Sequence, residues 1–521
     1  MHTQIRIFPE HLPVAFEGDG WCDAHHSTMS KKPISRPPTR SDPGSQPSIA
    51  KLRVGLFGVG LDTYWPQFDG LLDRLTGYQK RIATRLQDDD VELVDVGMVD
   101  SPLKAREAAL RFRQAGVDLI FLYVSTYALS STVLPVVQQA RVPVIVLNLQ
   151  PVPQLDYAAF NRLGDRGLMT GIWLEHCQAC SAPEIACVFN RADIPYHLVT
   201  GYLEQEAAWQ EIGDWLDAAR VAVGLRENRV GVLGHYYCGM LDVYSDLTQQ
   251  SAVFGTHFEL LEICELHRLR EAVTAAQIKA KVAQFNREFT VAAECQADEI
   301  RRAAKTSCAL DALVAKHQLG ALAYYYESED GLPYRDIVTS VIPGNTLLTG
   351  HRVPVAGECE IKNVQAMKIM DLLGVGGSFS EFYLADFTDD VVLLGHDGPA
   401  HFAIAEGRVG LVPLPIYHGK PGKGLSIQMT VKHGPVTLLS VVQGAAGKVF
   451  LLVAEGESVP GPVLEIGNTN SRYRFKIGAT AFMNEWSRSG PAHHCAIGVG
   501  HIANKIGKLA ALLGIECRKV G

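Results

Sequence analysis

Acidic and imidazole side chains stand at the ends of apolar segments in the C-terminal part of this 521-residue chain. Glu327 ends the segment LAYYYE, Glu358 lies in PVAGECE, and His396 follows VVLLG. His493 and His494 are neighbours in GPAHHCAIG, between a Gly-Pro turn and an apolar stretch. Because ligand sites in α/β sheets lie at the C-terminal ends of strands, these side chains are candidates for a functional site.

Two carboxylates and two imidazoles together offer a metal ion oxygen and nitrogen ligands. Such a set suits Mn²⁺, Co²⁺ or Mg²⁺ and needs no thiolate. Cys359 and Cys495 stand next to Glu358 and His494. Successive side chains of a strand point to opposite faces, so we do not expect these cysteines to be ligands. Each candidate alone is weak evidence, because a strand-end Glu is usually solvated and a lone His is more often hydrogen-bonded in a core. The prediction depends on several of them in one region.

The strands that would position this site belong to a pattern that begins at Leu52. Continuous Val/Ile/Leu strands alternate with helices, which indicates a parallel sheet covered on both faces. The predicted strands are LRVGLFGV, VELVDVGMV, VDLIFLYVS and VPVIVLNLQ, and the predicted helices are about Gln67–Gln87, Ser101–Ala115 and Ser130–Ala140.

A second α/β unit is predicted from Tyr196, and the pattern changes after about Gly350. Helices are expected at about Glu204–Val223 and Ala272–His317, and strands at RVGVLG, Leu260–Glu265 and Leu319–Tyr326. Later segments such as RVGLVPLPIY and KVFLLVAEGE are short strands with Gly/Pro turns, typical of an antiparallel barrel or sandwich. A final helix is expected at Ile497–Leu513.

The predicted fold class is therefore α/β, with two doubly wound parallel domains followed by a mainly antiparallel, barrel-like domain. Residues 1–50 are expected to be a flexible extension, because KKPISRPPTRSDPGSQPS has almost no apolar side chains to bury. The expected domains are 51–195, 196–349 and 350–521.

Composition excludes several classes of protein. A net charge of -8 argues against nucleic acid as the main partner. No apolar run reaches the roughly 18–20 residues of a membrane helix, and no signal-peptide pattern is present, so we expect a cytoplasmic protein. The Gly58-x-Gly60 turn lacks the third glycine of a dinucleotide fingerprint, so no nucleotide cofactor is expected. Cys177 and Cys180 form a C-x-x-C pair, which we interpret as reduced structural thiols, with a metal or redox role as the alternative.

In several segments the chain resembles the L-arabinose isomerase family and its broader group with L-fucose isomerase. The resemblance is distant and interrupted, and it is most specific in YYYESEDG, PVAGECEIKNVQAMKIMDLLG, LLGHDG and SGPAHHCAIGVGH. It departs from the family at Ser125-Thr126-Tyr127 and Asn148, where family members commonly carry histidines. These departures bear on the identity of the substrate more than on the reaction.

The resemblance implies roles for residues of these motifs. Glu327, Glu358, His396 and His494 match the positions that bind a divalent metal, usually Mn²⁺, in family members. His493 is the alternative to His494 as the ligand. The two glutamates also match the residues that transfer protons in aldose–ketose isomerisation. The family implies a homo-oligomer, of which a hexamer is the common form.

The leading hypothesis is an isomerase of a free monosaccharide, with L-arabinose to L-ribulose as the first choice and D-galactose or L-fucose as other substrates. A proton moves between C1 and C2 and another between O1 and O2, through an enediol, so the reaction needs an acid and a base. A metal would polarise the carbonyl. The alternatives are a catalytically silent sugar-binding or regulatory relative and a metal-dependent hydrolase.

Overall fold

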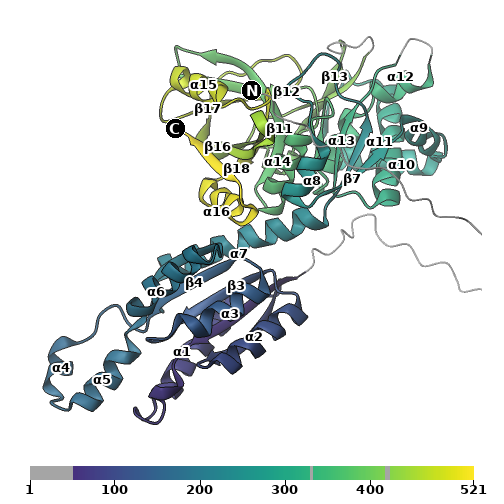
Figure 1. Cartoon of the computed structure of the whole chain (residues 1–521). Helices are drawn as coiled ribbons and strands as arrows, with labels where there is room; N and C mark the ends of the chain where they lie inside the picture. The colour runs from purple at the N-terminus through teal and green to yellow at the C-terminus, as the bar shows by residue number, and fades with distance from the viewer. Residues whose placement is uncertain (1–50, 329–331, 417–422) are drawn as a thin grey trace, which may run out of the picture. The chain divides into compact units, whose positions relative to one another are not determined.

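The computed structural model describes residues 51–328, 332–416 and 423–521 (Figure 1). The predicted extension at 1–50 lies outside the described residues. Within these ranges, none of the helices has both the length and the apolar character needed to cross a membrane.

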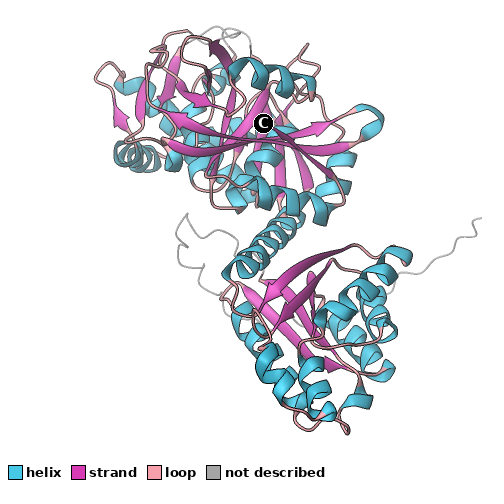
Figure 2. Ribbon diagram, turned by 90° about the vertical axis from the view of Figure 1, so that its left-hand side faces the viewer, coloured by secondary structure: helices cyan, strands magenta, loops and turns pink. Residues whose placement is uncertain are grey.

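The first sheet has five parallel strands in the order β2-β1-β3-β4-β5. Their side chains alternate between two cores. One core packs against α1 and α7, and the other against α2, α3 and α6. In Figure 2 the strands of this sheet have helices on both sides. The predicted doubly wound sheet is confirmed here. The strands are β1 (Leu52–Val59), β2 (Val91–Val99), β3 (Leu119–Val124), β4 (Val144–Gln150) and β5 (Tyr196–Tyr202).

The helices predicted at Ser101–Ala115 and Ser130–Ala140 match the structure closely, whereas the first helix begins at Leu71 and the helices between Tyr157 and Arg191 were not predicted. The side chain of Ser101 accepts a hydrogen bond from the backbone N–H of Lys104 and caps α2. That helix ends at Gly116, whose φ of 61° is left-handed and suits glycine. The helices are α1 (Leu71–Leu86), α2 (Pro102–Ala115), α3 (Ser130–Ala140), α4 (Tyr157–Arg162), α5 (Arg166–Glu175), α6 (Gln178–Arg191) and α7 (Glu206–Glu227).

The second unit was expected to begin at Tyr196, but the strand that begins there, β5, belongs to the first sheet. β5 pairs in parallel with β4 over its whole length, from Val144 opposite Tyr196 to Gln150 opposite Tyr202. The first sheet therefore continues beyond residue 195. The predicted boundary at residue 349 also divides a sheet, because β10 (Val355–Ala356) pairs with a strand that precedes this residue. The division into three folded domains stays a prediction.

A second parallel sheet has the order β10-β9-β6-β7. The predicted strand at Leu260–Glu265 is only partly correct, because β7 ends at Leu261 and a helix starts at Ile263. The predicted long helix at Ala272–His317 is two helices, separated by a short strand that pairs with β13. The elements are β6 (Arg229–Gly234), β7 (His257–Leu261), β8 (Thr290–Val291), β9 (Ala321–Tyr325), α8 (Leu247–Phe254), α9 (Ile263–Glu271), α10 (Ala275–Glu288), α11 (Ala297–His317), α12 (Pro333–Val338), α13 (Ile342–Gly350) and α14 (Ile361–Leu372).

The last region is an antiparallel barrel, as predicted. Six strands pair in the ring β15-β18-β11-β12-β17-β16, and β15 pairs with β16 to close it. A separate small sheet has the strand order β14-β13-β8. The strands are β11 (Gly376–Asp386), β12 (Val391–His396), β13 (Gly410–Leu414), β14 (Gly424–Gln428), β15 (Gly434–Gln443), β16 (Val449–Val459), β17 (Thr469–Arg474), β18 (His494–Val499) and β19 (Glu516–Val520).

The helix that was predicted at Ile497–Leu513 starts later than expected. Its first residues belong to β18, because their alternating side chains pack inside the barrel. The helix itself is α16 (Ala503–Leu513), and α15 (Ala479–Arg488) precedes it. After α16 the chain forms β19, which adds to β16 in parallel.

Helix α14 joins the second sheet to the barrel. Every residue from Ile361 to Asp371 is buried. Its apolar side chains pack in one core with Ala323 of β9, Leu439 of β15 and Ala496 of β18. A helix that is buried all round belongs in a core, so this helix fixes the position of the sheet's C-terminal edge against the barrel strands.

Candidate metal centre

Three of the four predicted ligands meet in one cluster. One ligand atom each from Glu358, His396 and His494 lies within 4.8 Å of the others. Glu358 follows β10, His396 ends β12 and His494 begins β18. These strands belong to the second sheet and to the barrel, so the cluster forms where the sheet edge meets the barrel.

The middle of β11 explains why the two histidines lie together. Its first half pairs with β18 and its second half with β12, and Glu381 is opposite both His494 and Gly395. His396 therefore follows directly on a residue that is level with His494. The ring of Phe379, also from β11, contacts both imidazoles, with centroid distances of 4.5 and 4.3 Å.

The backbone at Glu358 has an unusual conformation. Glu358 and Cys359 have φ angles of 55° and 57°, in the left-handed region that non-glycine residues rarely adopt. The N–H of Cys359 donates to the carbonyl of Tyr324 at 2.9 Å, and the N–H of Tyr237 donates to the carbonyl of Glu358 at 3.4 Å. Strain of this kind is concentrated at functional sites, and here it directs the Glu358 side chain to the histidines.

His494 is held as a neutral ring with one nitrogen facing the cluster. Its Nδ1 lies 2.6 Å from the buried carboxyl of Glu360. Burial and, to a smaller extent, the charge of His493 lower the pKa of His494 to about 3. Among the described residues, Nε2 has no hydrogen-bond partner. A carboxylate behind a histidine fixes its tautomer in this way in many metal sites.

Glu358 has the complementary arrangement. Its Oε2 lies 3.6 Å from Nε2 of His494 and 3.3 Å from Nε2 of His493. Burial alone would raise the pKa of Glu358. The hydrogen bond and charge of His493 and the charges of His494 and His396 outweigh burial and lower the pKa. The carboxyl is therefore ionised near neutral pH. Nε2 of His494, which has no hydrogen-bond partner among the described residues, and the ionised Oε2 of Glu358 face one point and fit a divalent cation.

His493 lies between two carboxylates. Its Nδ1 is 2.6 Å from Oδ2 of Asp242, and its Nε2 is 3.3 Å from Oε2 of Glu358. Burial would lower the pKa of His493, but the hydrogen bonds and charges of these carboxylates raise it to about 9. Both ring nitrogens face acidic partners, so His494 fits the role of ligand better than His493.

His396 has a hydrogen bond that bears on its role. The backbone N–H of Gly398 donates to its Nδ1 at 2.8 Å. A neutral ring that accepts at Nδ1 carries its proton on Nε2. A ring that binds a metal through Nε2 must instead carry the proton on Nδ1. Metal binding through Nε2 and the hydrogen bond from Gly398 therefore exclude each other.

Glu327 lies outside the three-residue cluster. It is exposed, and its Oε1 accepts a hydrogen bond of 2.7 Å from the Tyr325 hydroxyl. Tyr325 lines the cavity beside Glu358, so the hydroxyl links Glu327 to that cavity. The predicted role of Glu327 as a ligand stays a prediction.

A cavity of about 420 Å³ opens beside the cluster. Its lining is partly acidic, partly aromatic and partly apolar. It includes Tyr237, Tyr325, Glu358, Glu381, His396 and Asn468. The cavity is large enough for a monosaccharide, and its polar groups offer hydrogen-bond partners for hydroxyl groups.

Three carboxylates of this site were not predicted from the sequence. Asp242 holds His493, Glu360 holds His494, and Glu381 joins the two histidines in a second group of possible ligands. Glu360 stands two residues after Glu358, and this spacing could have identified it as a candidate. Asp242 is 251 residues before His493, so no local pattern could have connected them.

Comparison with known proteins gives no match to a family model. The L-arabinose isomerase of Aeromonas salmonicida (strain A449) is 20% identical over 345 residues, which cover 63% of this chain and 67% of the relative. The chain is similar to L-arabinose isomerases. The L-arabinose isomerase of Aeromonas hydrophila subsp. hydrophila is 21% identical over the same length and shares. The resemblance to L-arabinose isomerases that the motifs indicated is therefore confirmed.

Among solved structures, similarity is very weak. An ABC transporter periplasmic solute-binding protein from Actinobacillus succinogenes 130z, solved with bound D-allose, is 13% identical and matches 55% of this chain and 82% of its own. Its TM-score of 0.16 is too low to carry an argument.

Proposed function

We propose that this protein is a metal-dependent aldose–ketose isomerase that acts on a free monosaccharide, with L-arabinose to L-ribulose as the first candidate reaction. One observation carries the proposal. Nε2 of His494, which has no hydrogen-bond partner among the described residues, and the ionised Oε2 of Glu358 lie 3.6 Å apart beside a sugar-sized cavity. Similarity to two L-arabinose isomerases supports the class of reaction.

Glu358, His494 and His396 are the residues that would hold the metal. Mn²⁺ is the first candidate, and Co²⁺ or Mg²⁺ would suit the same oxygen and nitrogen ligands. When bound, the ion would polarise the substrate carbonyl and favour negative charge on the two substrate oxygens. The tautomer of His494, which Glu360 fixes, leaves Nε2 ready for this role without a proton to lose.

Proton transfer belongs to the carboxylates. Glu358 is ionised near neutral pH and lines the cavity, so it can remove the proton from C2 of the aldose. Returning a proton to C1 completes the transfer between the carbons. Glu327 is the second candidate group, and the Tyr325 hydroxyl that donates to it faces the same cavity. The first proton transfer forms the enediol and the second consumes it, so the carboxylates of Glu358 and Glu327 must both keep their positions during the reaction.

The test is ketose formation by the purified protein with Mn²⁺ and a panel of aldoses that includes L-arabinose, D-galactose and L-fucose. We expect turnover of at least one sugar and its loss, by 100-fold or more, in Glu358→Gln. Glu485→Gln changes an exposed glutamate of α15 in the same way and is the matched control.

Two results would overturn the proposal. The first is sugar binding without any turnover on the whole panel, which is the behaviour of a silent relative. The second is full activity of Glu358→Gln. The predicted homo-oligomer is not part of this test, and light scattering of the same sample measures it directly.

A further inference from the structure

Two cysteines far from the proposed metal site in the sequence lie in contact. Sγ of Cys177 and Sγ of Cys180 are 2.9 Å apart. A disulfide bond is about 2.05 Å long, so the two sulfur atoms have less than one ångström to move. Cys177 is the N-cap residue of α6, and Cys180 lies in its first turn.

Hydrogen bonds hold the chain between the two cysteines and directly after Cys180. The side-chain amide of Gln178 donates to the carbonyls of Ser125 and Glu175, at 2.9 and 2.8 Å. The hydroxyl of Ser181 accepts from the N–H of Ala128 at 2.8 Å. Gln178 and Ser181 are both fully buried. The entropy of bringing the thiols together is therefore already spent in the reduced protein, which raises their effective concentration.

We propose that Cys177 and Cys180 form a reversible disulfide, with a low-molecular-weight disulfide of the glutathione class as the oxidant. In the first step the Cys180 thiolate attacks one sulfur of the oxidant, forms a mixed disulfide and releases one thiolate. In the second step the Cys177 thiol gives its proton to the thiolate released in the first step and attacks the Cys180 sulfur, which forms the protein disulfide and releases the second thiolate. One oxidant molecule gains two electrons, and the protein loses two thiol hydrogens.

The two thiols differ in a way that sets this order. Cys180 is exposed, whereas Cys177 is buried. Burial and, to a smaller extent, the adjacent Cys180 raise the pKa of Cys177 to about 12. The buried thiol is therefore protonated and shielded from the oxidant. Exposure makes Cys180 the first thiol to react, and contact makes Cys177 the thiol that resolves the mixed disulfide.

The same helix offers a matched control. Cys187 lies in α6 and is also exposed. Cys187→Ser removes an exposed thiol and leaves the proposed pair intact. Cys180→Ser removes one member of the pair at an exposed position, where the substitution places little demand on packing.

The experiment equilibrates the full-length protein with a series of oxidised and reduced glutathione mixtures, quenches with acid, alkylates the free thiols and measures intact mass and peptide masses. We expect Cys177 and Cys180 to become protected together, with the loss of two hydrogens, in the wild type and in Cys187→Ser. Reduction by dithiothreitol should restore both thiols. In Cys180→Ser we expect Cys177 to stay free.

Three results would overturn the proposal. Both thiols could remain free in excess oxidised glutathione. Cys180 could stop as a stable glutathione adduct while Cys177 stays free. Protection could also be lost in Cys187→Ser, which would make Cys187 the partner. None of these readouts depends on isomerase activity, so the result is independent of the proposed function.

Discussion

Glu360 and Lys362 stand behind the residues that face the cluster. Glu360 is fully buried, and burial raises the pKa of its carboxyl to about 7, although the charge of Lys362 opposes this. Nζ of Lys362 lies 3.7 Å from Glu360 and donates to the carbonyl of Asp242 at 2.8 Å. Lys362 therefore connects the carboxylate behind His494 with the backbone of Asp242, the residue whose carboxylate lies behind His493.

The first prediction concerns this supporting shell. Glu360→Gln keeps an acceptor for the Nδ1 proton of His494, whereas Glu360→Ala removes it. We expect Mn²⁺ affinity to fall by about 10–100-fold in the alanine variant and by less in the glutamine variant, because such carboxylates orient the ligand. Titration of bound Mn²⁺ by electron paramagnetic resonance measures this, with Glu485→Gln as the unchanged control. Equal affinity in all variants would contradict the role of Glu360.

The second prediction concerns His396. If this ring binds the metal through Nε2, the N–H of Gly398 must lose its acceptor, because Nδ1 then carries the proton. We expect hydrogen exchange at the Gly398 amide to become faster when Mn²⁺ is added. Protection that is unchanged at saturating Mn²⁺ would show that His396 donates a proton to the substrate or another group and is not a ligand.

At this scale the sequence predicted part of the site. Glu358, His396 and His494 were found because each stands where an apolar segment ends, and the structure brings them together. Asp242 and Glu360 were missed because their role depends on which side chains lie behind the ligands. That information is in the tertiary contacts, and neither residue has a distinctive local pattern.

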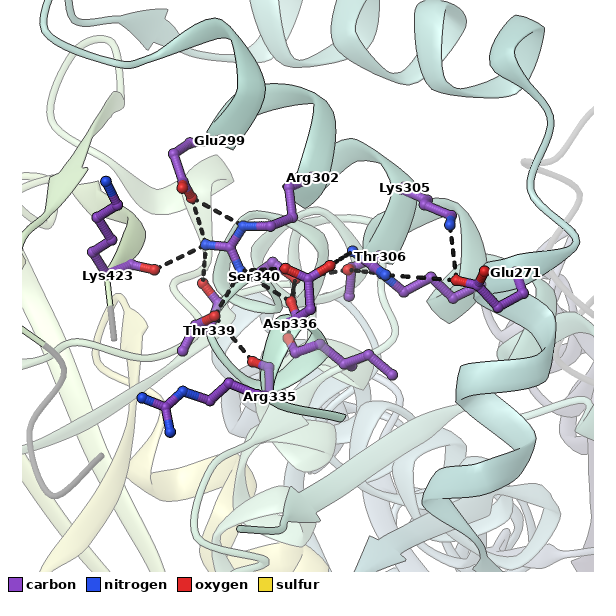
Figure 3. Close-up of polar contacts among 12 residues, drawn as sticks. Glu271, Glu299, Arg302, Lys305, Thr306, Arg335, Asp336, Thr339, Ser340 and Lys423 are labelled. Atoms are coloured by element: carbon purple, nitrogen blue, oxygen red, sulfur yellow. Dashed lines mark hydrogen bonds and ion pairs between the residues drawn. The ribbon is translucent and has the colours of Figure 1, made fainter. Parts of the chain in front are cut away.

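Among the elements, α11 and α12 are joined by a polar network that supports one wall of the cavity. Figure 3 shows the Arg302 guanidinium between Glu299, Thr339 and the carbonyl of Lys423. It donates to the hydroxyl of Thr339 at 2.6 Å and to the carbonyl of Asp336 at 3.0 Å. The chain then continues into α13, whose first residue lines the cavity.

The third prediction tests this network. The Arg302 side chain is only 15% exposed, and its removal would leave the hydroxyl and carbonyl oxygens of the buried Thr339 without this donor. We expect Arg302→Ala to lower the free energy of unfolding by about 2–4 kcal/mol. Arg302→Lys should recover only part of this, because an ammonium group cannot reproduce the planar fork.

The neighbouring arginine is a matched control for this prediction. The side chain of Arg301 is 60% exposed and has one ion pair, with Asp298. We expect Arg301→Ala to change stability by less than about 0.5 kcal/mol. Urea denaturation of the three variants gives the comparison. A similar loss for Arg301→Ala and Arg302→Ala would show that the network contributes nothing special.

Most elements were predictable from hydrophobic pattern, and the errors have a common cause. A second unit was predicted to begin at Tyr196, but the strand there belongs to the first sheet, because pairing is decided by neighbours outside the segment. The interruption between α10 and α11 was missed because β8 has only two residues and is held by β13, more than a hundred residues later. The residues from Ile497 to Val499 were predicted as the start of the final helix but belong to β18, because the strands that pair with them lie elsewhere in the sequence.

At the scale of the whole molecule, one histidine couples stability to pH. The ring of His197 in β5 stacks on Trp215 of α7, with centroids 4.2 Å apart. Burial and the charge of Lys508 lower the pKa of His197 below the ordinary histidine value of about 6.5. The unfolded chain binds the proton more readily than the folded chain does. The contribution of neutral His197 to stability is therefore complete above about pH 6.5 and is lost as the pH falls.

The fourth prediction follows from this sign. His197→Phe keeps an aromatic ring on Trp215 and removes the titration. Between pH 7.5 and pH 5.5, we expect the wild type to lose more free energy of unfolding than His197→Phe does. His433→Gln, at an exposed position, should behave like the wild type. Parallel slopes for the wild type and His197→Phe would contradict the assignment.

The fold class was predictable at this scale because each region has one dominant period. Buried parallel strands are continuously apolar, and the barrel strands alternate. How α14 joins the second sheet to the barrel could not be predicted, because a helix that is buried all round has no polar face to indicate its neighbours.

The ion pair between Asp242 and His493 joins residues that are 251 positions apart. Glu360 and His494, which also meet here, are 134 positions apart. Contacts between such distant parts of a chain form late, because the loop between them must be ordered first. The capacity to take up a cation should therefore be among the last properties that a refolding molecule regains. A chain with nearly all of its helices and strands in place would still be unable to bind the ion until these long loops close.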